Sequence, residues 1–157
     1  MDSLYTALLH THNILRWVIL IFLLLNIFRH IGAGQRPFDK TDKALGLPLL
    51  IAAHLTLLIG IYQWAVGPWG LKQIQEYGGA VMKDSVNRFW AIEHPVMMLI
   101  GIILITVGRA QARSKHTSRV QHRRTALYFT LALIALALAV PWPFREVIGR
   151  PWLPGMY

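Results

Sequence analysis

The sequence predicts an all-α integral membrane protein, a single domain (residues 1–157) built as a four-helix up-down bundle with both termini outside. Hydrophobic residues make up 55% of the chain and the mean hydropathy is +0.44, above the range of soluble domains. The excess lies in four apolar segments of about 20 residues, the length at which an α-helix crosses the hydrocarbon core of a bilayer. Basic residues are concentrated in alternate loops, which indicates a fixed membrane orientation.

The first two segments are predicted spans at residues 8–28 and 47–66. The first is expected to be a retained helix and not a cleaved signal peptide, because no basic residue precedes it and Arg16 interrupts its apolar run. Gly and Pro in the following linker predict a break, after which Thr41 or Asp42 is expected to cap the second helix.

The third and fourth predicted spans cover residues 90–107 and 126–144. The loop at residues 67–88 is expected to form a short interfacial helix, since aromatic side chains flank it as they do at membrane surfaces. The fourth span is expected to end where Pro141 and Pro143 break the helix.

Charge fixes the expected topology. Basic residues greatly outnumber acidic ones in the loops after the first and third spans: Arg29, Arg36, Lys40, Lys43, Arg109, Arg113, Lys115, Arg119, Arg123 and Arg124 against Asp39 and Asp42. On the other face the two signs nearly balance. The positive-inside rule therefore predicts cytoplasmic basic loops in a multi-pass protein of the bacterial inner membrane. Nucleic acid is an improbable partner, because these loops have almost no aromatic residues to stack on bases.

The chain has no cysteine, which excludes iron–sulfur clusters, covalently attached haem, zinc–thiolate sites and disulfides. Any metal must then be held by histidine, methionine or carboxylate. His12 and His94 are both expected about 6 Å below the outer surface, by the rise of an α-helix. Spans 1 and 3 are diagonal in an up-down bundle, so these imidazoles can oppose one another as axial ligands of a porphyrin. His10 is the alternative to His12, but it points to a roughly opposite side of the helix.

The other histidines give weaker predictions. His54 lies near the middle of the second span, where an ionisable group marks either a functional site or a neutral histidine bonded to a neighbouring helix. His122 is its only candidate partner on the fourth span, with a depth mismatch of about 10–15 Å. His30 and His116 are expected to be solvated in the basic loops.

Arg16 and Glu93 are charged residues near this predicted histidine pair. Arg16 follows His12 by four residues and Glu93 adjoins His94. They are expected either to form a salt bridge or to bind haem propionates, and a buried Glu93 could accept a proton as quinol is oxidised.

Four blocks, in order, resemble a family of small bacterial four-span membrane proteins labelled cytochrome b-like: "LLHTHNILRWVIL", "AAHLTLLIGIYQWAVGPWGL", "MKDSVNRFWAIEH" and "VPWPFREVIGRPW". The resemblance covers most of the chain. It implies histidine ligation of one or two b-type haems at His10 or His12, His54, His94 and, in "QHRRT", His122. The chain differs from two-haem cytochromes b, which place two ligands on each of two helices.

Three functions are consistent with the sequence. The first is an electron-transfer protein with b-type haem that exchanges electrons with quinone or with a redox partner, alone or as a homo-oligomer in the lipid bilayer. The second is a haem-free copper or zinc site made by His10, His12, Glu93 and His94. The third is a structural or accessory membrane subunit whose histidines bond neighbouring helices.

Overall fold

A computed structural model describes residues 3–154, which are helical throughout apart from their connections, with no strand in that range. Four long helices form the bundle: α1 (Ser3–Ile31), α2 (Lys40–Val66), α5 (His94–Ala110) and α6 (Ser118–Ala139). Between α2 and α5 lie α3 (Leu71–Tyr77), the 3-10 turn η1 (Gly78–Met82), α4 (Ser85–Arg88) and the π-helical turn η2 (Phe89–Glu93). The 3-10 turn η3 (Gln111–Arg113) follows α5.

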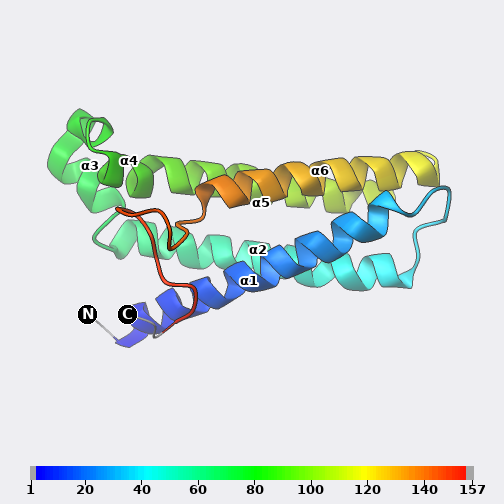
Figure 1. The fold of residues 1–157 in the computed structure, drawn as a ribbon, viewed down its shortest axis with the longest axis horizontal. Helices are drawn as coiled ribbons and strands as arrows, with labels where there is room; N and C mark the ends of the chain where they lie inside the picture. The colour runs from blue at the N-terminus through cyan, green and yellow to red at the C-terminus, as the bar shows by residue number, and fades with distance from the viewer. Residues whose placement is uncertain (1–2, 155–157) are drawn as a thin grey trace.

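The long helices run alternately up and down, as Figure 1 shows. α1 packs against α2 and α6, and α5 packs against the same two helices, so α1 and α5 are diagonal as expected. One end of the bundle is here called the α3–α4 end. It contains the start of α1, the α3–α4 segment and the C-terminal segment at residues 140–154. The connections at residues 32–39 and 111–117 lie at the other, here called the basic end.

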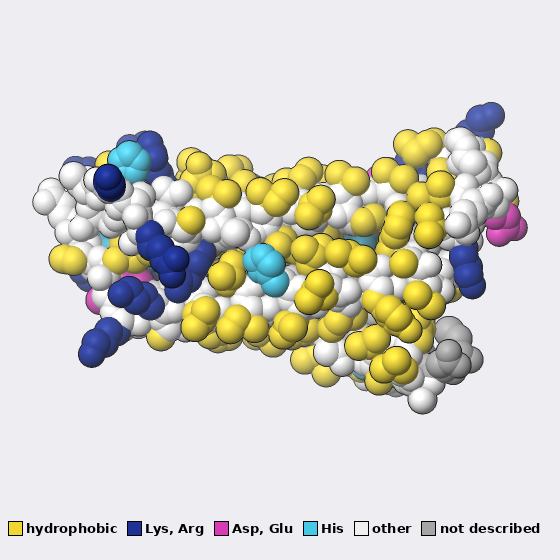
Figure 2. Space-filling model, turned by 180° about the vertical axis from the view of Figure 1, so that it is seen from behind, with side chains coloured by type: hydrophobic (Ala, Val, Ile, Leu, Met, Phe, Trp, Pro, Cys, Tyr) yellow, Lys and Arg dark blue, Asp and Glu magenta, His cyan; other side chains and the backbone are white. Residues whose placement is uncertain are grey.

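The surface is apolar where a soluble protein would be polar. The interior is closed by side chains such as Leu23, Leu49, Ile105 and Phe129, each at most 1% exposed. Many large apolar side chains nevertheless face outward, among them Phe28, Leu58, Ile134 and Leu138. Figure 2 shows this apolar belt along the bundle, with lysine and arginine gathered toward the basic end. An apolar belt of this extent indicates contact with a lipid bilayer.

Within residues 3–154, three helical stretches are long and apolar enough to cross a membrane: Ser3–Ile31, Lys40–Met82 and Ser85–Arg113. α6 is not among these stretches that have both the length and the hydropathy to cross a membrane. Its first turns carry Arg119, His122, Arg123 and Arg124, and it ends at Ala139, before the predicted end at residue 144. The chain turns there because Pro141 and Pro143 lack the N–H groups that would continue the helix.

The start of α2 corrects another expectation, because its N-cap is Asp39 and not Thr41 or Asp42. The Asp39 carboxylate accepts from the backbone N–H groups of Thr41 and Asp42, at 2.8 and 3.0 Å. Asp42 is the third helical residue, and its side chain accepts from the Asp39 N–H at 2.8 Å. The two aspartates thus form a reciprocal capping box.

Candidate functional site: two histidine pairs

The structure brings His12 and His94 together at the α3–α4 end. His12 lies in the third turn of α1, and His94 is the first residue of α5. Their ring centroids are 6.5 Å apart, with an angle of 55° between the ring planes. Of the two candidates on α1, it is therefore His12 whose ring lies against His94.

A backbone carbonyl fixes the orientation of His94. Its Nδ1 donates to the carbonyl oxygen of Ala139, at 2.8 Å, near the C-terminus of α6. A neutral imidazole that donates from Nδ1 carries its lone pair on Nε2, the arrangement typical of a metal-binding histidine. The rings of Phe89 and Trp90 lie 5.7 and 5.6 Å from the His94 ring, so it is enclosed by aromatic side chains.

The π-helical turn η2 directly precedes His94. A π turn holds one residue more than an α-helical turn, so it changes which way the following residues face. η2 therefore sets the direction in which α5 presents His94, and it also places Glu93 among the exposed residues.

His12 packs on α2, where Gly60 makes room for it. A Cβ atom at Gly60 would lie 3.3 Å from Cε1 of His12, tighter than an ordinary contact. The Nδ1 atom of His12 is buried and has no hydrogen-bond partner among the described residues. A buried, unpaired imidazole nitrogen is costly for a purely structural residue and is available to bind a metal.

The expected contact between Arg16 and Glu93 is not formed. Arg16 instead donates to Asn13 Oδ1 at 2.9 Å and to the carbonyl oxygen of Trp152 at 2.8 Å. Trp17 Nε1 donates to the same carbonyl at 2.9 Å, so the C-terminal segment is tied across α1. Glu93 is exposed and pairs with Arg88 at 2.6 Å.

The candidate pairing of His54 with His122, left open by the sequence, is not formed. His54 is exposed on α2, and its Nδ1 donates to the carbonyl of Leu50, one turn earlier, at 2.9 Å. A polar group that bonds to its own helix needs no neighbour. His122 lies instead at the basic end, where it contacts His30, a residue that the sequence predicted to be solvated.

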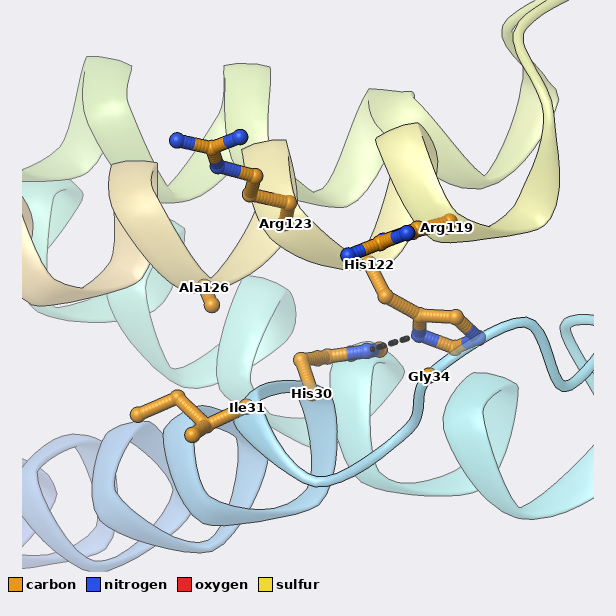
Figure 3. Close-up of a pocket in the computed structure, with 7 residues that line it drawn as sticks. All are labelled: His30, Ile31, Gly34, Arg119, His122, Arg123 and Ala126. Atoms are coloured by element: carbon orange, nitrogen blue, oxygen red, sulfur yellow. Dashed lines mark hydrogen bonds between the residues drawn. The ribbon is translucent and has the colours of Figure 1, made fainter.

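His30 and His122 form a second, buried histidine pair. The Nδ1 atom of His30 lies 2.7 Å from Nδ1 of His122, and the two residues are only 3% and 1% exposed (Figure 3). Phe38 stacks on His122 with ring centroids 4.2 Å apart. A signal for His30 does exist in the sequence: it continues the stripe Leu23, Ile27 at helical spacing, both buried.

Hydrogen bonding fixes the tautomers of this second pair. His122 Nε2 lies 2.8 Å from the carbonyl oxygen of Arg36, which can only accept, so this nitrogen carries the proton. In neutral His122 the Nδ1 is then an acceptor, and His30 donates to it from its own Nδ1. The lone pair of His30 is left on Nε2, for which no described residue provides a partner.

Asp42 lies beside this pair but is fully engaged by arginine. Ligand atoms of His30, Asp42 and His122 lie within 4.8 Å of one another, a spacing that suits a metal ion. However, Asp42 Oδ1 accepts from Arg29 and Arg36, both at 2.9 Å, and its Oδ2 accepts from Arg36 and from the Asp39 N–H. A cation would have to displace these guanidinium groups, so the cluster is better described as an ion-pair network.

The same network perturbs the groups on the connecting loop. The hydrogen bond from the Asp42 backbone lowers the pKa of Asp39, with a further contribution from Arg29. The hydrogen bond to Asp42 raises the pKa of Arg36. Both shifts favour the charged forms, so the ion pairs stabilise the loop between α1 and α2.

The fold and the site define a class: an all-helical, membrane-embedded bundle with a histidine pair near each end, of which the His30–His122 pair is buried. Comparisons with protein-family models, with curated proteins and with solved structures gave no match to this chain. Its function must therefore be inferred from the site.

Proposed function

We propose that this chain is a four-span electron-transfer protein of the bacterial inner membrane that binds one b-type haem between α1 and α5. His12 and His94 would be the axial ligands. Both termini would be outside and the basic end cytoplasmic, as the positive-inside rule requires. Electrons would be exchanged with quinone in the bilayer or with a redox partner protein.

The observation that carries the proposal is the 6.5 Å separation of the His12 and His94 rings. A metal about 2 Å from one nitrogen of each of two opposed imidazoles holds the ring centroids about 6 Å apart. The pair already has that spacing, and it joins helices that are diagonal across the bundle.

The donor chemistry also suits haem iron. His12 has a buried nitrogen for which residues 3–154 provide no partner, and His94 is held by Ala139 with its other nitrogen unprotonated. Neutral imidazoles oriented by a backbone carbonyl are the usual ligands of six-coordinate b-type haem. When bound, such a haem carries single electrons by cycling between ferric and ferrous iron. Glu93, next to His94, is exposed and paired with Arg88, so the buried carboxylate expected from the sequence is not found and the proposal gives Glu93 no role in proton transfer.

Optical spectra of the purified protein, oxidised and reduced, test the proposal. The expected result is a six-coordinate low-spin haem spectrum at one haem per chain. It should be abolished by His12→Ala or His94→Ala and kept by the control His54→Ala, which replaces an exposed histidine. A protein that takes up no haem when haem is supplied would refute the assignment, and loss of haem in the control would refute the ligand pair.

A second candidate is a haem-free copper or zinc site on the same two histidines. Close packing favours it, because His12 touches α2 at Gly60 and aromatic rings enclose His94. A bare ion needs less room than a porphyrin. Elemental analysis of protein purified without added metal separates the two: copper or zinc that is lost in His94→Ala, with no haem, supports this candidate. A protein with neither haem nor metal would be an accessory membrane subunit.

A further inference from the structure

We propose that the basic end contains a binding site for the phosphate headgroup of an anionic phospholipid, between α1 and α6. The site is a cavity of about 330 Å³ next to the second histidine pair, in the size range of ligand pockets. Figure 3 shows its lining: His30, Ile31, Gly34, Arg119, His122, Arg123 and Ala126. The inference is independent of haem, since the cavity lies at the end opposite to His12 and His94.

The cavity carries positive charge that no described residue neutralises. Arg119 and Arg123 are four residues apart, on one face of α6, and both are exposed. Neither makes a hydrogen bond or ion pair within residues 3–154. Arg29, in the last turn of α1, and Arg36, in the loop that follows, differ because they are held by Asp39 and Asp42. An anion is therefore the complementary ligand.

The histidine pair adds a hydrogen-bond acceptor to the cavity wall. His30 donates from Nδ1 to His122, so Nε2 is the only nitrogen it can offer to a ligand, and Nε2 accepts. A ligand with both a negative charge and a hydroxyl group would satisfy the arginines and His30 together. Phosphatidylglycerol, with a phosphodiester and a glycerol headgroup, has this chemistry.

Apolar side chains favour a lipid over a free phosphate ion. Ile31 and Ala126 line the cavity, and Ile31 is 68% exposed. A second hollow of similar size shares Arg123 and is lined by Val120, Arg124 and Leu127. Arg123 leans away from His30 in Figure 3, so it can serve both hollows. Val120 and Leu127 are exposed and continue into the apolar belt, where acyl chains would lie.

Native mass spectrometry of the detergent-solubilised chain tests the site, with phosphatidylglycerol and phosphatidylcholine as probes. The expected result is tighter binding of phosphatidylglycerol. The double variant Arg119→Gln/Arg123→Gln should weaken it by about 25-fold, from about fivefold for each cation. The control Lys40→Gln/Lys43→Gln removes equal charge from exposed residues at the same end and should change binding less than twofold. Ile31→Trp should weaken binding with no change of charge, by filling the cavity.

Three results would overturn the proposal. Equal losses in the two double variants would show general attraction to a basic surface. Equal binding of both lipids would show that the arginines do not select a headgroup. Full competition by inorganic phosphate at the lipid's own concentration would identify the occupant as a soluble anion.

Discussion

Single backbone carbonyls decide what each histidine pair can do. The carbonyl of Ala139 holds the proton of His94 on Nδ1 and leaves Nε2 for a metal. The carbonyl of Arg36 holds the proton of His122 on Nε2, so His122 accepts from His30 and the pair is bonded to itself. The His12–His94 pair is thus suited to binding a metal, whereas the His30–His122 pair stabilises the loop after α1 and the wall of the cavity beside it.

Gly60→Ala should weaken haem or metal binding by about 1–2 kcal/mol, because the new methyl group presses on the His12 ring. Titration of the purified variant with haem, or with the ion, measures the loss. Gly101→Ala is a matched control, since its Cβ would meet Leu136 at 3.2 Å, a similar strain away from the histidines. Equal affinity in wild type and Gly60→Ala would contradict the placement of His12 in the site.

His122→Leu should lower the free energy of unfolding by about 1–3 kcal/mol, because His30 and the Arg36 carbonyl lose their buried partner. Denaturation in detergent, followed by circular dichroism, gives the value. His116→Leu changes an exposed histidine and should stay within about 0.5 kcal/mol. If both variants behave alike, the buried pair contributes nothing to stability.

Residue positions were predictable where helical rise alone decides them. His12 and His94 follow from depth along two spans, and the structure places their rings against each other. The burial of His30 and the exposure of Glu93 could not be predicted in this way. The burial of His30 depends on a loop that folds back and lays Phe38 over the pair. The outward direction of Glu93 depends on a π turn, which α-helical periodicity does not reveal.

At the scale of elements, the start of α2 is the most strongly determined feature. Asp39 caps the helix and also receives Arg29 and Arg36, both at 2.7 Å. Asp42, with a fully buried side chain, completes the box and the ion pairs. The sequence predicted a cap here but misplaced it by two or three residues, because Asp39, Thr41 and Asp42 are all good capping residues.

The stability contributed by this cap should depend on pH. The folded chain lowers the pKa of Asp39, so its carboxylate stabilises the fold above about pH 4, the ordinary pKa of aspartate. That contribution is lost as the pH falls below this value and through the lower pKa of the folded state. Asp39→Asn, a neutral capping residue, should therefore differ from wild type at pH 7 and converge with it in acid. Unfolding curves between pH 3 and pH 7, at roughly unit spacing, measure this, and a difference that is constant with pH would contradict it.

At the scale of the whole molecule, the number of crossings depends on α6. The sequence predicted four spans, and three helical stretches within residues 3–154 have the length and hydropathy to cross. α6 carries basic residues in its first turns and stops at Ala139, yet it packs along α5 and α1 for its length. The bundle was predictable from the four apolar segments. The limits of the fourth depend on where basic side chains and proline stop it, which hydropathy alone places poorly.

Single cysteines can decide the topology, because the natural chain has none. Four crossings predict that Ser85→Cys and Val147→Cys react with an impermeant maleimide from one side of the membrane, and Ser114→Cys from the other. The first two lie at the α3–α4 end and Ser114 at the basic end. If α6 does not cross, Val147→Cys will react from the same side as Ser114→Cys.

The π turn before His94 contains one residue more than a regular α-helical turn, so the number of residues in it affects how His94 is oriented relative to the preceding chain. A turn of this kind is an α-helix with one residue too many, and deletion of Ile92 would return it to regular winding. The rest of α5 would keep its length and composition, but α5, with His94, would be rotated by about 100° relative to the chain before the turn. One codon therefore sets how His94 and the segment before it are turned relative to each other, with almost no change in the hydrophobicity of the chain.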